Sequence, residues 1–419
     1  MFRRTFIWLL PFALASCALP TLRTPSAPKP TAERPAPPIE TRDTAAPVAP
    51  VAPVAPAALP IRFRQIALLL PLSSAHARAA IAVRDGFMAM HRTAPETDRP
   101  AVKVYDTGAD DKLREVYETA QREGADFIVG PLGRLAVDRL VRGGTLLTPT
   151  LLLGTTPTKP AQPAVFQFAL DPEQDARQAA EHLYFRGHRL VATLTPASET
   201  GRRVADAFRN HFEAIGGVVA ASGAYNETGS EHAQTIKSLL DLTGSEERKA
   251  RLASALKTRI EFTPRRRQDL DALFLHAGPA QARLIRPQLG YYQALDLPVY
   301  ATPQAYTGRP DPIADGDLEG LRFGDMPWLL AQNTRIQNAR ERIQGDWPYR
   351  YSELDRLYAL GMDAYALPAS LSRLRAEPAA WLDGMTAELG LDANGVVMRR
   401  LTWARFDRGR PVLEDAARR

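Results

Sequence analysis

The stretch Ile66-Ala67-Leu68-Leu69-Leu70-Pro71-Leu72-Ser73-Ser74 decides the fold. Its first five residues are continuously apolar, and the proline and serines that follow end the run in a turn. A short apolar run bounded by turn residues is typical of a strand that is buried on both faces of a sheet. Residues 77–90 come next, with apolar side chains at helical spacing. This order of strand, turn and helix predicts the first unit of a parallel sheet.

The same alternation continues along the chain. We predict strands at 102–106, 127–129, 190–194, 217–223, 272–275 and 297–300, and helices at 112–123, 175–186, 201–215 and 281–293. The alternation restarts after residues 165–171, where we expect the chain to pass first from one lobe to the other. The charged stretch 244–260 is predicted to be an insertion with a solvated helix. The pattern therefore predicts an α/β fold of two doubly wound, Rossmann-like lobes.

The N-terminus has the features of a secretory signal. Arg3 and Arg4 precede an apolar run of roughly ten residues, too short for a helix that spans a bilayer, which needs about 20. The run ends in Leu14-Ala15-Ser16-Cys17, the lipobox pattern of bacterial lipoproteins. We expect a signal peptide over residues 1–16 and lipidation of Cys17; the alternative is an ordinary signal peptide followed by a chance cysteine. Cys17 is the only cysteine, which excludes an intramolecular disulfide and a CxxC redox pair.

Residues 18–60 differ sharply in composition from the rest of the chain. Proline, alanine, threonine and valine dominate, as in Ala45-Ala46-Pro47-Val48-Ala49-Pro50. Such a segment buries too little apolar area to fold, and its prolines favour an extended polyproline II conformation. We therefore predict a linker over residues 17–60 that acts as a tether, with a passive leader as the alternative, and a folded domain over residues 61–419.

Composition and motifs argue against nucleic-acid binding and catalysis. The chain has 53 basic and 47 acidic residues, a small and scattered excess that favours a solvated surface. The sequence has no GxSxG elbow, no phosphate-binding glycine loop and no HExxH pair. His182 and His188 are six residues apart, which is wrong for one helix face. We expect no enzyme, no cofactor and no metal site.

A binding cleft is expected where parallel strands end, because ligands of doubly wound sheets bind outside the carboxyl ends of the strands. Hydroxyl groups and the free N–H groups of helix starts at these turns can bind an anion. The turns carry no arginine, so we expect no carboxylate clamp. Each residue has a competing role as a helix cap or turn former. The candidates are Ser73, Ser74, Asp106, Thr107, Gly108, Gly130, Pro131, Leu132, Thr155, Thr156, Ser198, Glu199, Thr200, Ala277 and Gly278.

Two longer stretches are more specific: RRRQDLDALFL at 265–275 and RLYALGMDAY at 356–365. Together with residues 66–73, 82–87, 104–108, 124–132, 281–289, 297–302, 325–330 and 403–406, they resemble the penicillin-binding protein activator lipoproteins (LpoA/LppC-like). The resemblance covers nearly all of residues 64–412. It implies a type I periplasmic-binding-protein fold whose chain crosses three times between lobes, lobe 1 at about 64–168 and 335–380 and lobe 2 at about 169–334 and 381–419.

The resemblance also implies a function. It implies that the protein binds and activates a bifunctional class A penicillin-binding protein, a peptidoglycan synthase, from the outer membrane. Ala18, rather than an aspartate, follows Cys17, which favours the outer membrane. Well-known members carry a helical, repeat-like domain where this chain has the Pro/Ala-rich segment. The main alternative is a lipid-anchored receptor for an amino acid or another small ligand in the cleft between the lobes.

Overall fold

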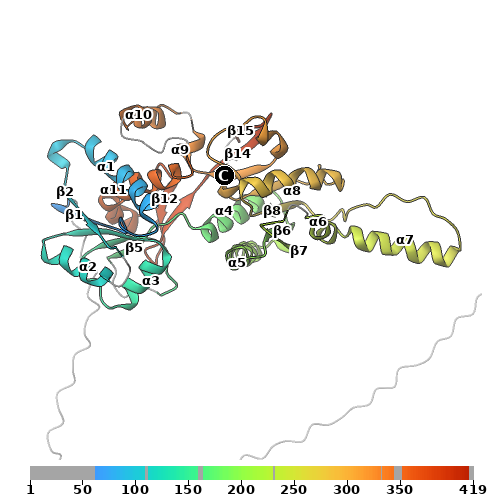
Figure 1. Ribbon diagram of the computed structural model, residues 1–419, viewed down its shortest axis with the longest axis horizontal. Coiled ribbons are helices and arrows are strands. Elements are labelled where there is room, and N and C mark those ends of the chain that lie inside the picture. Colours follow the sequence, from blue (N-terminus) through green and yellow to red (C-terminus); the bar gives the residue numbers. More distant parts are fainter. Residues whose placement is uncertain are drawn as a thin grey trace, which may run out of the picture. The chain divides into compact units, whose positions relative to one another are not determined.

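The computed structural model describes residues 62–108, 112–158, 164–229, 232–331, 333–343 and 352–414 (Figure 1). The expected signal peptide, Cys17 and the linker lie outside the described residues. The first sheet contains β1 (Gln65–Leu70), β2 (Ala101–Asp106), β3 (Phe127–Leu132), β4 (Thr150–Leu153) and β5 (Val165–Gln167). The strands are parallel and lie in the order β2-β1-β3-β4-β5.

The apolar run of β1 is explained by helices on both faces of this sheet. Ile66, Leu68 and Leu70 belong to one core cluster, whereas Ala67 and Leu69 belong to another, as the alternation of side chains along a strand requires. The first cluster is formed with α1 (Ala77–Thr93) and α11 (Asp355–Ala376), and the second with α2 (Leu113–Arg122) and α3 (Arg134–Arg142). Because helices cover both faces of the sheet, the side chains of β1 that point to either face are apolar.

The second sheet repeats this plan. It has the order β15-β14-β10-β9-β8-β6-β7, and its first five strands along the chain are parallel. They are β6 (Leu190–Pro196), β7 (Val218–Tyr225), β8 (Ala272–Leu275), β9 (Val299–Ala301) and β10 (Arg322–Asp325), with antiparallel β14 (Thr402–Asp407) and β15 (Arg410–Leu413) at one edge. One face packs on α4 (Pro172–Phe185) and α5 (Glu199–Ala214), and the other on α6 (Ala233–Leu239) and α8 (Pro279–Tyr291).

The two sheets share one strand order. In each, the first strand of the lobe lies between the second and the third, so the order reverses beside it: β1 lies between β2 and β3, and β6 between β7 and β8. This arrangement confirms the predicted pair of doubly wound lobes. It also places the expected ligand crevice at the ends of β1 and β3 and of β6 and β8.

A small third sheet contains β11 (Leu382–Asp383), β12 (Glu388–Leu391) and β13 (Val397–Arg400). Its buried residues Leu389, Leu391 and Val397 pack in the core of the first sheet. The expected lobe limits grouped residues 381–400 with the second lobe, whereas these contacts group them with the first. The chain thus passes between the sheets after β5, between β10 and α11, and after β13. Beside these passages, α9 (Pro327–Leu330) and α10 (Thr334–Ile343) share a core cluster with α11.

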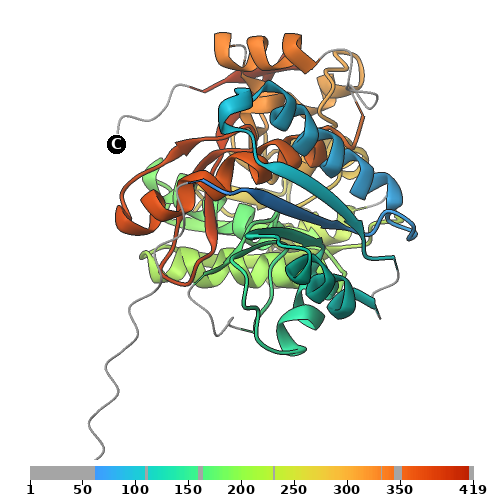
Figure 2. The same cartoon turned by 90° about the vertical axis from the view of Figure 1, so that its left-hand side faces the viewer.

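The charged insertion forms α7 (Leu242–Leu256), close to the predicted position. Its N-terminal turn contacts α6, and Figure 1 shows the helix beyond α6 and away from the strands of the second sheet. Figure 2 views the other lobe, where α1 and α11 cover one face of the first sheet.

Candidate binding cleft between the lobes

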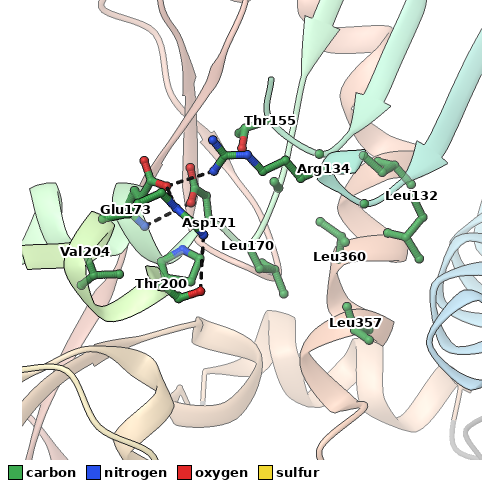
Figure 3. A pocket seen from close by; sticks show the side chains of 16 residues that line it. Leu132, Arg134, Thr155, Leu170, Asp171, Glu173, Thr200, Val204, Leu357 and Leu360 are labelled. Atoms are coloured by element: carbon green, nitrogen blue, oxygen red, sulfur yellow. Dashed lines mark hydrogen bonds and ion pairs between the residues drawn. The ribbon is translucent and has the colours of Figure 1, made fainter. Parts of the chain in front are cut away.

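A cavity of about 370 Å³ lies where the strand ends of the first lobe meet the helix starts of the second (Figure 3). The first lobe contributes the ends of β3 and β4, the start of α3 and one face of α11. The second lobe contributes the starts of α4 and α5. The lining residues are Leu132, Gly133, Arg134, Leu153, Gly154, Thr155, Ala169, Leu170, Asp171, Pro172, Glu173, Thr200, Arg203, Val204, Leu357 and Leu360.

Three of the residues predicted from sequence line this cavity: Leu132, Thr155 and Thr200. They come from β3, from the turn after β4 and from α5, so three separate strand-to-helix regions meet here. Much of the remaining wall is apolar, including Leu153, Leu357 and Leu360. The cavity can therefore hold a small, partly apolar group, with its polar contacts confined to one side.

That polar side is an ion-pair network centred on Glu173. Its carboxylate accepts hydrogen bonds from Arg134 Nη1 at 3.0 Å and from Arg203 Nε at 2.9 Å. Arg134 starts α3 of the first lobe, whereas Glu173 and Arg203 lie on α4 and α5 of the second, so the network joins the lobes. Figure 3 shows Arg134 and Glu173 pointing toward one another across the cavity. The hydrogen bond to Glu173 is the main reason why the pKa of the Arg203 guanidinium is raised.

Sequence reasoning missed these charged residues, because none of the turns that it singled out contains an arginine. The usable signal is their position: Arg134 directly follows the turn Gly130-Pro131-Leu132-Gly133, and Glu173 follows the N-cap of α4. That N-cap is Asp171, whose carboxylate accepts a hydrogen bond from the Glu173 N–H at 3.1 Å. Burial raises the pKa of Asp171, although this hydrogen bond opposes the shift.

The predicted residues after β1 and β2 form a turn of their own. The carboxylate of Asp106 accepts hydrogen bonds from the N–H groups of Ser73 at 3.2 Å and Gly108 at 2.9 Å. Burial raises the pKa of Asp106, but the hydrogen bonds from Ser73, Gly108 and Leu72 outweigh it and lower the pKa overall. The Ser74 hydroxyl donates to the Pro71 carbonyl at 3.0 Å, and Thr107 is buried. Asp106 faces a separate hollow of about 210 Å³.

Gly130 and Pro131 set the end of β3 against β1. Gly130 has a φ of 109°, and a Cβ there would lie 2.2 Å from the Leu69 carbonyl oxygen, so only glycine fits this close approach. The Gly130–Pro131 peptide is cis. Neither residue lines the cavity, whereas Leu132, which directly follows them, does.

Most of the other predicted residues act as caps or partners of neighbouring groups. The Thr156 hydroxyl donates to Asp138, Ser198 caps α5 by accepting from the Gly201 N–H at 3.2 Å, and Glu199 binds Arg203 at 2.9 Å. Ala277 is buried. Gly278 precedes α8 and lines a second, open hollow of about 1010 Å³, together with Gln304, Arg309 and Arg356.

Two buried ion pairs lie beside the passages between the lobes. Arg399 of β13 binds Asp175 of α4, with side chains only 2% and 3% exposed. Arg356, at the start of α11, binds Asp325 of β10, with Nε–Oδ1 at 3.2 Å. Burial raises the pKa of Asp175 to about 6, against the attraction of Arg399. These pairs tie β10 to α11 and α4 to β13.

Among the described residues, no group of three or more His, Cys, Asp or Glu side chains is placed to hold a metal ion. In the same part of the chain, no helix is both long and apolar enough to cross a membrane.

Comparison with curated proteins identifies relatives over most of the chain. The penicillin-binding protein activator LpoA of Photobacterium profundum is 31% identical over 352 residues, 81% of this chain and 55% of the relative. The protein of the same name from Aliivibrio fischeri is 29% identical over 348 residues, 82% of this chain and 57% of the relative. The chain thus spans a little more than half the length of these relatives.

Solved structures agree on the fold. Full-length LpoA from Haemophilus influenzae matches with a TM-score of 0.66 and 24% identity, over 84% of this chain and 59% of that one. The LpoA C-domain from the same organism matches with a TM-score of 0.63 and 24% identity, over 83% of this chain and all of that one. A putative branched-chain amino acid ABC transporter protein from Chromobacterium violaceum matches with a TM-score of 0.59 and 26% identity, over 82% of this chain and 99% of that one. The fold is therefore that of periplasmic binding proteins.

The family model described as LppC putative lipoprotein matches residues 38–409, from within the Pro/Ala-rich segment almost to the end of the chain. That range includes all strands of the two doubly wound lobes except the edge strand β15, together with the small third sheet and the cavity between the lobes. This chain belongs to the LppC lipoprotein family.

Proposed function

We propose that this protein binds and activates a class A penicillin-binding protein, a bifunctional peptidoglycan synthase. The observation that carries the proposal is the similarity, over about four fifths of the chain, to proteins named penicillin-binding protein activator. The Haemophilus C-domain, whose whole length this chain matches in fold, is described as a regulator of PBP1A. The described domain therefore corresponds in fold to the part of the Haemophilus protein that carries this description.

The contents of the cleft favour an activator over a small-ligand receptor. Both arginines that line the cavity, Arg134 and Arg203, already bind Glu173. A carboxylate ligand would have to displace Glu173 and leave that side chain without its partners in a partly buried site, which is costly. The buried pairs Asp175–Arg399 and Asp325–Arg356 also oppose separation of the lobes.

We further propose an anchored location for the domain. A signal peptide over residues 1–16, a lipid on Cys17 and a linker over residues 18–60 would hold the domain of residues 61–419 on the outer membrane, facing the periplasm. The lipobox, the linker composition and membership of a lipoprotein family support this arrangement. Activation would require the protein to prefer one conformation of the synthase, because equal affinity for two states shifts nothing.

The proposal is tested with the full chain and its cognate class A synthase, both purified in detergent. We expect the rate of glycan polymerisation or of cross-linking to rise and to saturate as the concentration of this protein increases. A periplasmic binding protein of the same fold but another family serves as the control and should leave the rate unchanged. An unaltered synthase rate over a wide concentration range, together with no detectable binding, would refute the proposed function.

A further inference from the structure

The insertion between β7 and β8 carries a helix that the rest of the described domain barely covers. We call residues 242–265 the arm; it comprises α7 and the segment that returns from it. Leu242 and Ser245, in the first turn of α7, are 4% and 6% exposed and pack toward α6. From Glu246 onward most residues are exposed, and Figure 1 shows α7 extending away from the second sheet.

The exposed apolar side chains of α7, Leu252 and Leu256, indicate that another molecule covers this helix. Its alanines, leucines and charged residues favour a helix, but an isolated helix of about 15 residues is marginal in water. Leu252 and Leu256 lie one turn apart and are 52% and 59% exposed, and Phe262 on the returning segment is 37% exposed. Neighbouring leucines on one exposed helix face are typical anchors for a groove on another protein.

The arm also carries an excess of positive charge. Its residues 242–265 include six basic and three acidic residues, a net charge of +3, whereas the whole chain has a formal net charge of only +6. Arg248 binds Asp241 at 3.1 Å, and Lys249 lies over the Phe262 ring at 5.7 Å. Arg251, Lys257, Arg259 and Arg265 are exposed. A partner that is complementary to this surface carries negative charge where it faces the arm.

The apolar stripe formed by Leu252 and Leu256 is better suited to bind a groove on a protein than the surface of a membrane. Helices that lie in a membrane interface have a broad apolar face with large side chains. Here α7 offers only two exposed leucines, and the residue one turn before Leu252 is Lys249, half-buried against the Phe262 ring. We infer that the arm docks on the class A synthase, with Leu252 and Leu256 entering an apolar groove that has an acidic rim. This inference rests on the proposed function and names the surface that serves it.

The test compares two double variants of the full chain in detergent. L252E/L256E places carboxylates on the docking stripe, and L135E/L147E makes the same change at leucines of the first lobe that are 79% and 80% exposed. Because all four side chains are exposed, neither variant should lower the melting temperature or the helical circular dichroism. We expect L252E/L256E to weaken synthase binding by at least about tenfold and to raise the concentration needed for activation accordingly, with L135E/L147E unchanged.

A charge variant tests the acidic rim. R251E/R259E should slow association with the synthase, and most of the difference from the unmodified protein should disappear at high salt, because screening removes long-range steering. If the unmodified protein activates the synthase and L252E/L256E does so equally well, the arm is not the docking surface, although the proposed function stands. If the unmodified protein itself neither binds nor activates, the proposed function fails first. Loss of binding to anionic phospholipid vesicles in L252E/L256E, with synthase binding intact, would overturn the inference in favour of a membrane contact.

Discussion

At the scale of single residues, buried charges hold together segments that lie far apart in sequence. The Asp175–Arg399 pair joins α4 to β13, and Gln174 beside it donates to the Val397 carbonyl at 3.0 Å and accepts from Arg399 at 3.1 Å. Removing one partner of such a pair leaves the other charge buried without compensation. The buried pair should therefore respond to mutation very differently from surface pairs.

Arg399→Met should lower the free energy of unfolding by about 3–5 kcal/mol near neutral pH. Burial already raises the pKa of Asp175, and without Arg399 that pKa should rise further. The folded-state pKa then lies above the unfolded value near 3.9. The contribution of Asp175 to the free energy of unfolding is therefore fully present at low pH and is lost as the pH rises through the folded-state pKa. The defect should therefore shrink at acidic pH, which urea unfolding at several pH values measures.

Arg202→Met is the matched control for this variant. Arg202 lies 3.6 Å from Asp206, and the two side chains are 68% and 47% exposed. Exposed pairs contribute little, so we expect a change within about 0.5 kcal/mol at every pH. Equal losses in the two variants would contradict the assignment of Arg399 as a buried tie between the lobes.

The pKa of Glu414 shifts in the opposite direction to that of Asp175. Its carboxylate accepts hydrogen bonds from Arg322 at 2.8 Å and Arg186 at 3.1 Å and is 12% exposed. Burial raises its pKa, but His182 and the two arginines outweigh burial and lower it. Glu414→Gln should destabilise the fold by about 1.5–3 kcal/mol at pH 7.

The pKa of Glu414 is lowered on folding. The contribution of this carboxylate to the free energy of unfolding is therefore present above its unfolded-state pKa near 4.3 and is lost as the pH falls through its folded-state pKa. The difference in free energy of unfolding between the Gln variant and the unmodified protein should thus disappear at acidic pH. Unfolding curves between pH 7 and the acid limit of solubility check this, and a constant gap would show that packing, not charge, accounts for the loss.

At the scale of elements, the contact between α1 and α11 depends on two glycines. A Cβ at Gly86 would lie 1.9 Å from the Tyr358 carbonyl oxygen, and one at Gly361 would lie 2.0 Å from the Val83 carbonyl oxygen. The missing side chains let the two helices approach closely over the first sheet (Figure 2). This requirement lies within the stretch RLYALGMDAY, which was among the most specific in the sequence.

Gly361→Ala should destabilise the domain by about 1–3 kcal/mol because the helices must move apart. Alanine is intrinsically the better helix former by about 1 kcal/mol, so the sign of the change separates packing from propensity. Gly316→Ala is the control, since nothing lies within 4 Å of a Cβ built there. Thermal unfolding of both variants measures the difference; a stabilised Gly361→Ala variant would refute the close-packing explanation.

At the scale of the whole molecule, we propose that anchoring decides where the domain acts. Cys17→Ser should remove the lipid and release the protein from membranes into the soluble periplasmic fraction, because stable anchoring requires two or more acyl chains and the variant would carry none. Fractionation of cells and immunodetection measure this. Retention of the variant in the outer-membrane fraction at high salt would contradict a lipid anchor.

The proposed role of the Pro/Ala-rich segment as a tether can be tested by deleting it. Deleting residues 18–60 should leave activation of the purified synthase unchanged, since no distance has to be spanned in solution. In cells the same deletion should abolish activation, because the anchored domain could no longer reach a synthase in the inner membrane at a high effective concentration. A deletion that works equally well in cells would show that the segment is a passive leader.

The sequence by itself determined the layers of the fold. Apolar runs such as residues 66–70 are buried on both faces, and their alternation with amphipathic helices leaves a doubly wound parallel sheet as the natural arrangement. It also placed Leu132, Thr155 and Thr200 near the cleft, because strand ends in such sheets meet at one edge. Local patterns suffice for these features because they depend on neighbours within one or two turns of the chain.

The chemistry of the cleft was decided only by the tertiary structure. Arg134 and Arg203 lie 39 and 30 residues from Glu173, and nothing in their local sequence specifies that three helix starts converge. The same applies to Arg399, which lies 224 residues from Asp175, and to the strands β11 to β15, which are two to six residues long and acquire their partners only on folding. The strength of an ion pair depends on the distance between the charges and on their burial, and both are set only when the lobes pack together.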